Sequence, residues 1–140
     1  MAFFFFGTLM DRDVLEQVLA RPVDDRELSA ARLPGYRRVR TACALYPMLV
    51  PDPGGVVEGV VLREASARDE ARIRHFEADE YVDRWMPVSL PPGGTRRVRV
   101  FFALAELGET DEPWDLARWA AEHKAGFLAQ CRVWMRDCPD

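Results

Sequence analysis

The chain has 140 residues, of which 49% are hydrophobic and 30% charged, and this balance predicts one globular domain over residues 1–140 with a sizeable core. Lysine and arginine number 19 against 23 aspartates and glutamates, which argues against nucleic acid or an anionic membrane surface as a partner. No apolar stretch approaches the roughly 18 residues of a membrane span, and the N-terminus lacks the basic region of a signal peptide, so we expect a cytoplasmic protein.

The chain begins with an apolar segment. Residues 3–6 are four phenylalanines, and because they do not alternate with polar residues they predict a strand that is buried on both faces and central in a sheet. Gly7 and Thr8 end this strand. Residues 11–20 then predict a helix, which Asp11 or Asp13 can cap, because four apolar residues recur at helical spacing: Val14, Leu15, Val18 and Leu19.

Three strand-like runs follow, over about residues 28–40, 41–50 and 56–62. Residues 51–55, PDPGG, give the strongest turn signal between them, since two prolines and a glycine pair favour a hairpin over a continuing ladder. We therefore expect antiparallel neighbours that reverse at this point. Ser66, with acidic residues at positions 69 and 70, predicts a helix start, and that helix should run to about Phe76.

The second half of the chain predicts further strands and a long helix. Residues 81–90 alternate weakly, residues 91–94 form a turn, and one or two strands follow from Val98. One helix is expected from Pro113 to about Asp137, because apolar residues recur there at steps of three, four or seven: Leu116, Ala120, Phe127, Cys131 and Trp134. Without repeats or linkers, these elements predict a single α+β unit with a mostly antiparallel sheet.

The cysteines and histidines give no strong chemical signal. Cys43, Cys131 and Cys138 are an odd number without metal-ligand spacing, so we expect packing residues and neither disulfides nor a metal site. His123 falls on the apolar stripe of the last helix, where a lone histidine is more often a packing residue.

The loop after the first strand is one candidate site. A glycine between a strand and a helix lets the backbone approach a ligand closely, and free N–H groups at a helix start favour a carboxylate or phosphate. Residues 7–10 have only one glycine and no following lysine, so they do not match a known phosphate loop. A plain turn remains the alternative.

Glu77 is the second candidate, in the segment HFEADEYVDRW at 75–85. It lies four residues after Ile73, about 40° away around a helix axis, so its carboxylate should project inward. Burial raises the pKa of a carboxyl group, which suits a general acid or base near neutral pH. The spacing also allows an ordinary helix-end glutamate that pairs with Arg74 or Arg84. The neighbouring acidic residues are expected to be solvated: Asp79, Glu80 and Asp83.

Four segments in order resemble the gamma-glutamylcyclotransferase-like family, in its branch named after avirulence-induced plant proteins. They are the Gly-Thr-Leu loop after the apolar strand, LPGY at 33–36, YPMLVPDPGGVVEGVVL at 46–62 and FEADEYVDR at 76–84. The resemblance covers roughly residues 3–102, and the segment WDLARWAAEHKAGFL is similar to the tail of bacterial members of that branch.

The resemblance implies an α+β fold in which a mixed sheet curls into a small barrel, with flanking helices, a long C-terminal helix and a pocket at one barrel end. It implies that Glu77 is the catalytic residue and that Tyr81 matches a downstream aromatic position. The backbone of the first motif would bind the carboxylate end of the substrate, and that motif maps onto Phe6, Gly7, Thr8, Leu9, Met10 and Asp11. Phe6 stands where the family usually has tyrosine, which bears on substrate choice.

The implied reaction is the cyclisation of a small-molecule gamma-glutamyl amide to 5-oxoproline, with release of an amine or amino acid and without a cofactor. A fold does not by itself establish activity. A non-catalytic binding domain, or another acyl-transfer or amide-cleaving reaction at Glu77, therefore remains an alternative. The sequence does not determine which amine is released or what the oligomeric state is.

Overall fold

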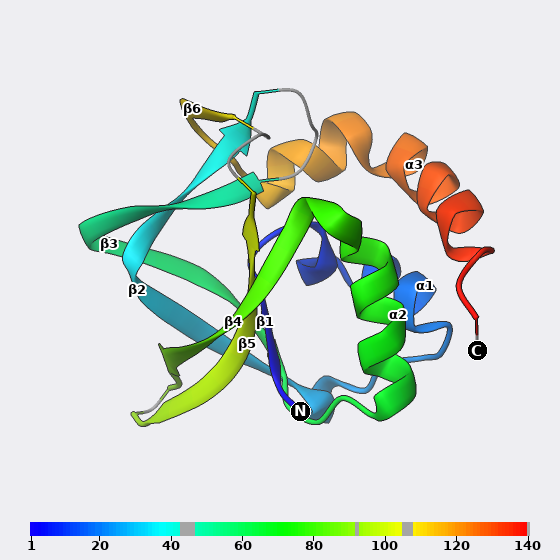
Figure 1. Cartoon of the computed structure of the whole chain (residues 1–140), viewed down its shortest axis with the longest axis horizontal. Coiled ribbons are helices and arrows are strands. Elements are labelled where there is room, and N and C mark those ends of the chain that lie inside the picture. The colour runs from blue at the N-terminus through cyan, green and yellow to red at the C-terminus, as the bar shows by residue number, and fades with distance from the viewer. Residues whose placement is uncertain (43–46, 92, 105–107, 140) are drawn as a thin grey trace.

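The structure is a computed structural model that describes residues 1–42, 47–91, 93–104 and 108–139. In this part of the chain, five strands close into a small barrel and three helices pack together on one side of it (Figure 1). This arrangement confirms the predicted α+β class and the small mixed barrel with flanking helices. Among the described helices, none combines the length and the apolar character that a membrane-spanning helix needs.

The barrel has one parallel contact, and its other contacts are antiparallel. Strand β1 (Phe3–Phe5) is antiparallel to β3 (Pro47–Leu62) and parallel to β5 (Thr95–Ala103). Strand β4 (Tyr81–Ser89) joins β5 to β2 (Leu28–Thr41), and β2 pairs with β3 to close the ring. The short β6 (Glu109–Pro113) extends the sheet at the other end of β2.

Strand β1 is central and buried on both faces, as its sequence predicts. Phe4 and Phe6 pack inside the barrel, whereas Phe3 and Phe5 face the cluster that the helices cover. Gly59 of β3 lets β1 come close, because a Cβ atom there would collide with the carbonyl oxygen of Phe5 and lie 2.6 Å from Cζ of Phe4. Strand β1 therefore contributes side chains to two hydrophobic clusters, one inside the barrel and one under the helices.

The predicted hairpin at residues 51–55 is wrong, because β3 runs through this segment. Residues 28–34 of β2 pair with residues 56–62, and residues 36–40 pair with residues 47–51. The register shifts at Gly35, whose φ of 89° is open to glycine at little cost, and residues 52–55 bulge opposite it. A bulge accepts prolines because its residues need not donate to the ladder. Strand β2 ends at Thr41 and its antiparallel neighbour β3 begins at Pro47.

Two of the described helices begin at the side chains that the sequence predicted, and the third does not. Helix α1 (Arg12–Leu19) starts at Asp11, whose carboxylate accepts from the N–H groups of Asp13 (3.0 Å) and Val14 (3.2 Å). Helix α2 (Ala67–Glu77) starts with a capping box between Ser66 and Asp69. Helix α3 (Leu116–Met135) is shorter than predicted, because Pro113 still belongs to β6 and Asp115 caps the helix at the N–H of Ala117 (2.8 Å).

The side chains predicted to pack do so in part. Cys131 is buried, and Cys138 packs partly against the helical cluster; both are free thiols. Cys43 lies outside the described residues. His123 is less buried than predicted, because its side chain is 40% exposed on α3.

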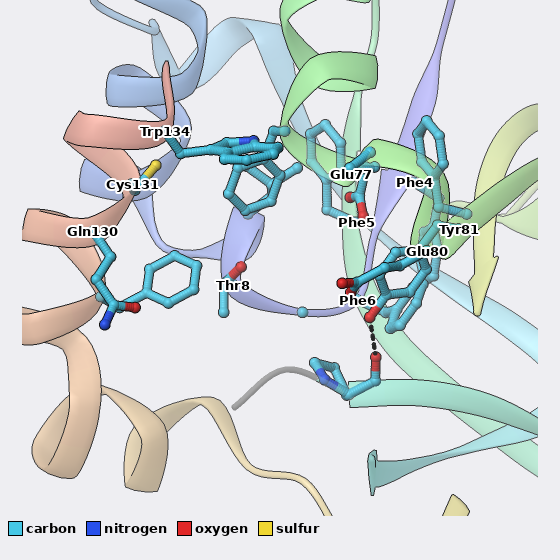
Figure 2. Close-up of a pocket in the computed structure, with 17 residues that line it drawn as sticks. Phe4, Phe5, Phe6, Thr8, Glu77, Glu80, Tyr81, Gln130, Cys131 and Trp134 are labelled. Atoms are coloured by element: carbon cyan, nitrogen blue, oxygen red, sulfur yellow. Dashed lines mark hydrogen bonds between the residues drawn. The ribbon is translucent and has the colours of Figure 1, made fainter. Parts of the chain in front are cut away.

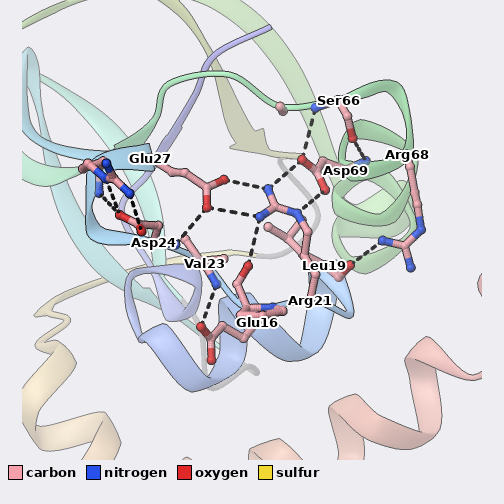
Figure 3. A network of polar contacts seen from close by, with 12 residues as sticks. Glu16, Leu19, Arg21, Val23, Asp24, Glu27, Ser66, Arg68 and Asp69 are labelled. Atoms are coloured by element: carbon pink, nitrogen blue, oxygen red, sulfur yellow. Dashed lines mark hydrogen bonds and ion pairs between the residues drawn. The ribbon is translucent and has the colours of Figure 1, made fainter.

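A partly buried ion-pair network links α2 to α1 and to the start of β2 (Figure 3). Arg21, just after α1, donates to both carboxylate oxygens of Asp69 (3.1 and 2.9 Å) and to Glu27 (3.2 Å). Burial would raise the pKa of Asp69, but the hydrogen bonds from Arg21 and Ser66 outweigh it and hold that pKa below its usual value. Because α2 ends at Glu77, this network positions the candidate site.

Candidate active site

A cavity of about 350 Å³ lies among the end of β1, the C-terminal end of α2 and helix α3 (Figure 2). It contains most of the residues that the sequence singled out, together with a set of aromatic rings. Its lining residues are Phe4, Phe5, Phe6, Gly7, Thr8, Leu9, Pro47, Phe76, Glu77, Ala78, Glu80, Tyr81, Phe101, Phe127, Gln130, Cys131 and Trp134.

Glu77 is the last residue of α2 and faces this cavity. Ile73, one turn earlier, is fully buried, so the inward direction inferred from the helical spacing agrees with the structure. Removal of the carboxylate from bulk water raises the pKa of Glu77 to about 8, and the negative charge of Glu80 adds to this effect. A carboxyl group with such a pKa can both accept and release a proton near neutral pH.

The two arginines that could have neutralised Glu77 are engaged elsewhere. Arg74 donates to both carboxylate oxygens of Asp83 (2.8 and 3.1 Å) and lies 3.6 Å from Glu70. Arg84 lies over the ring of Phe102, 5.4 Å from its centre. Within the described ranges, no basic side chain forms an ion pair with Glu77. The alternative of an ordinary paired glutamate is therefore not what the structure shows.

Two of the acidic residues expected to be solvated interact with other side chains of the site. Glu80 is exposed, but it also lines the cavity and acts on the pKa of Glu77. Asp83 is held between Arg74 and Arg99 (3.2 Å), and the hydrogen bond from Arg74 lowers its pKa. The position of Glu80 depends on the local backbone, and that of Asp83 depends on two arginines from other elements. Asp79 is exposed and does not line the cavity, as predicted.

Ala78 has a backbone conformation that the sequence did not suggest. Its φ of 58° and ψ of −158° place it in a region that is almost restricted to glycine. This residue ends α2 immediately after Glu77 and leads into the 3-10 turn Ala78–Glu80. That turn returns Glu80 to the same cavity as Glu77. Strain of this kind often accompanies functional sites.

The loop after β1 forms a 3-10 turn (Thr8–Met10) on the cavity wall. The N–H of Met10 donates to the carbonyl of Gly7 (3.0 Å), so it cannot bind a ligand as the sequence suggested. Among the described residues, no backbone carbonyl accepts from the N–H groups of Thr8 and Leu9. These two groups remain as candidates for holding an anion.

Met10 and Asp11, expected to bind substrate, lie outside the cavity lining. Asp11 caps α1 and forms an ion pair with Lys124 (2.9 Å), while Met10 packs against the helical core. The loop itself is held by Arg38, whose guanidinium donates to the carbonyls of Phe6 (2.9 Å) and Glu58 (3.1 Å). No motif in the sequence pointed to this arginine.

The other two predicted residues do line the cavity. Phe6 is buried at the end of β1. Tyr81, the first residue of β4, donates its hydroxyl to the carbonyl of Pro47 (3.1 Å), which leaves its ring on the cavity wall. Phe6, Gly7, Thr8, Leu9, Glu77 and Tyr81 therefore converge in space, although 70 residues of sequence separate the loop from the helix end.

Helix α3 supplies the far wall of the cavity, across from Glu77, Glu80 and Tyr81 (Figure 2). Trp134 is fastened to α2 by two reciprocal contacts, since its indole N–H donates to the carbonyl of His75 and its own carbonyl lies 3.0 Å from Nε2 of His75. The apolar stripe in the sequence predicted a packed helix, but it gave no sign that part of the stripe faces a cavity.

Cys131 does not have the properties of a nucleophile. Burial raises the pKa of its thiol to about 11, whereas nucleophilic cysteines need a thiolate near neutral pH. Among the residues that the structure describes, no group of three histidine, cysteine or acidic side chains is arranged to hold a metal ion. Among the described residues that line the cavity, Glu77 is the carboxyl group whose pKa is shifted toward neutrality.

Comparisons with known proteins support the fold and the family that the four sequence segments resemble. A sequence model of the family described as "Gamma-glutamyl cyclotransferase, AIG2-like" matches residues 3–121. AIG2-like protein A of Arabidopsis thaliana is 26% identical over 127 residues, which are 89% of this chain and 75% of that protein.

Solved structures of low sequence identity share the fold. A solution structure of an Arabidopsis thaliana protein superposes with a TM-score of 0.66 at 23% identity and covers 99% of this chain and 94% of its own. A yeast gamma-glutamyl cyclotransferase specific to glutathione superposes with a TM-score of 0.58 at 14% identity, over 100% of this chain and 88% of its own. At these identities the likeness concerns the fold alone.

Proposed function

The chain belongs to the gamma-glutamyl cyclotransferase, AIG2-like family, and we propose that it cyclises a γ-glutamyl amide to 5-oxoproline and releases an amine. One observation carries this proposal: the cavity holds a carboxyl group, Glu77, that has no basic partner among the described residues and whose pKa is raised to about 8. Thr8 and Leu9 line the same cavity, and no described backbone carbonyl accepts from their N–H groups, which in this proposal complete a site for a zwitterionic substrate.

The reaction needs only positioning and proton transfer. The α-nitrogen of the γ-glutamyl group attacks its own γ-carbonyl carbon, a five-membered lactam closes, and the bond from that carbon to the leaving nitrogen breaks. The α-nitrogen begins with three protons as an ammonium and keeps one in the lactam. The leaving nitrogen takes the other two and departs as an ammonium. Because nucleophile and electrophile belong to one molecule, the protein gains most of its effect by holding the attacking conformation.

Glu77 is the proposed proton shuttle. Ionised Glu77 accepts a proton from the α-ammonium, which frees the lone pair for attack, and protonated Glu77 then donates that proton to the leaving nitrogen. A second cycle of the same carboxylate carries the proton that the α-nitrogen loses on lactam closure to the departing amine, which leaves as an ammonium. A pKa of about 8 makes both steps accessible near neutral pH. The carboxylate therefore finishes each turnover in the state in which it began.

The loop after β1 is the proposed anchor for the other end of the substrate. The N–H groups of Thr8 and Leu9 would donate to the α-carboxylate, an anion that suits the start of a helical turn. Arg38 supports this loop through the Phe6 carbonyl (2.9 Å) and takes no direct part. With the α-carboxylate fixed, the α-nitrogen falls within reach of a shuttle on α2.

Turnover of a panel of γ-glutamyl amines, amino acids and peptides, followed by detection of 5-oxoproline, tests this proposal. Glu77→Gln should lower kcat/KM by about 10²- to 10⁴-fold, the usual size of a general acid–base contribution. Asp79→Asn is the matched control, because Asp79 is exposed, two residues away and outside the cavity. Binding of panel compounds without 5-oxoproline would favour the non-catalytic binding domain instead, and near-full turnover by Glu77→Gln would remove that residue from the mechanism.

A further inference from the structure

The wall of the cavity that faces the two carboxylates is aromatic, and its rings contact α2 and the core. Phe127 of α3 meets Phe76 of α2 edge to face, with ring centres 6.2 Å apart, and also contacts Trp119 at 5.2 Å. Trp134 is held by its two hydrogen bonds with His75. Rings that are already ordered bind a flat apolar group without a further loss of side-chain freedom.

The charged side chains that line the cavity are all acidic. Its carboxyl groups are those of Glu77 and Glu80, and none of its lining residues is basic. The residues outside the described ranges include no lysine, arginine or histidine, so they supply no missing cation. The N–H groups of Thr8 and Leu9 are engaged by the α-carboxylate in the proposed reaction. A second carboxylate, on the leaving group, would therefore meet like charge without a counter-charge.

The aromatic wall is separate from the part of the chain that the family model describes. That match ends at residue 121, whereas Phe127, Gln130, Cys131 and Trp134 follow it on α3. The loop after β1 and Glu77 lie within the match. The reacting end of the cavity is thus common to the family model, and the opposite end is built from residues beyond it.

We propose, resting on the function proposed above, that the substrate is a γ-glutamyl amide of an aromatic amine that carries no carboxylate. The γ-glutamyl end lies between Glu77 and the loop after β1, and the ring of the amine lies against Phe127 and Trp134. Cyclisation then yields 5-oxoproline and the free aromatic amine, which leaves as an ammonium. γ-Glutamyl amino acids and γ-glutamyl peptides are poor substrates here, because the part that leaves carries an additional carboxylate.

Three synthetic substrates separate the two features of this proposal. N-(γ-Glutamyl)phenethylamine and γ-glutamylphenylalanine differ only by one carboxylate, and γ-glutamylethylamide lacks the ring. We expect kcat/KM for the phenethylamide to exceed that of each of the other two by roughly tenfold or more, the discrimination that one missing or unmatched group brings in a binding pocket. Equal or higher values for γ-glutamylphenylalanine overturn the proposal.

Gln130→Lys tests the charge argument by gain of function. Gln130 is exposed on α3 and lines the cavity, and lysine is a good helix former, so the variant should fold. The added cation should shift the ratio of kcat/KM values toward γ-glutamylphenylalanine by about tenfold. Gln130→Ala is the control, and it should leave that ratio close to the parent value. An unchanged ratio in Gln130→Lys contradicts the argument.

Failure of this inference can be told apart from failure of the proposed function. Turnover of all three substrates without the expected preference overturns the inference and leaves the cyclotransferase assignment standing. Absence of 5-oxoproline from all three overturns the assignment, and the affinities of the same compounds, measured by titration calorimetry, then decide the inference. Tighter binding of the phenethylamide supports it, whereas equal or weaker binding contradicts it.

Discussion

Replacing Glu77 with glutamine should stabilise the protein, and the gain should grow as the pH rises. The folded state raises the pKa of Glu77 from its ordinary value of 4.5 to about 8. Between these two values the folded protein binds more protons than the unfolded chain, so the free energy of unfolding falls with increasing pH. Glutamine has the same shape and does not titrate. The variant therefore escapes this loss.

The size of the effect follows from the same pKa values. Each pH unit between them corresponds to about 1.4 kcal/mol, so full ionisation would destabilise the folded protein by up to about 5 kcal/mol. Glu77 keeps some exposed surface in the cavity, and water there screens the charge. We therefore expect a gain of roughly 2 kcal/mol above pH 8 and almost none near pH 4.

Thermal and urea unfolding of the parent and of Glu77→Gln, at several pH values from 4 to 9, measure this gain without any substrate. For a chain of this length, a difference of 2 kcal/mol raises Tm by about 4–8 °C. Asp79→Asn, at an exposed position outside the cavity, is again the control. A Glu77→Gln gain that is constant across the pH range would refute the reasoning, because it would show that Glu77 does not change its proton affinity on folding.

Three further outcomes are expected. Glu80→Gln should move the acid limb of the kcat/KM profile to lower pH by up to about one unit, because it removes a negative charge that helps to raise the pKa of Glu77; an unmoved limb contradicts this coupling. Phe6→Tyr should change relative rates across the substrate panel while the free energy of unfolding changes by no more than about 1 kcal/mol, and identical rate profiles would show that the hydroxyl is irrelevant. Ala78→Gly should raise the free energy of unfolding by about 1 kcal/mol in urea, because glycine adopts the positive φ without strain; a loss of stability argues against strain there.

The features that could be predicted from the sequence are those set by local patterns. The unbroken run of phenylalanines predicted a strand buried on two faces, and β1 has that environment. The helical spacing from Ile73 predicted that Glu77 points inward, because a helix repeats its direction every 3.6 residues. The caps at Asp11 and Ser66 were visible for the same reason, since capping needs only neighbours within one turn.

The features that could not be predicted depend on distant partners. Residues 51–55 look like a hairpin, but the opposite strand accommodates them as a bulge at Gly35. Glu80 lines the cavity at the end of a 3-10 turn that starts at Ala78, and no sequence pattern marks the positive φ of that alanine. Asp83 forms ion pairs with Arg74 of α2 and Arg99 of β5 and is only partly exposed. None of these relations has a signal within a few residues of sequence.

Gly59, which lets β1 approach β3, affects the register in which these two strands pair. Because residues 3–6 are identical, a strand that slid by one or two positions would still present a phenylalanine at nearly every place, and the apolar pattern cannot by itself choose among these pairings. Each step of sliding would displace the following loop by about 3.3 Å, and so carry the N–H groups of Thr8 and Leu9 away from Glu77. The close contact at Gly59 favours the observed pairing, because a larger residue of β3 does not fit there. A residue outside the cavity thus favours the register in which Thr8, Leu9 and Glu77 line the same cavity.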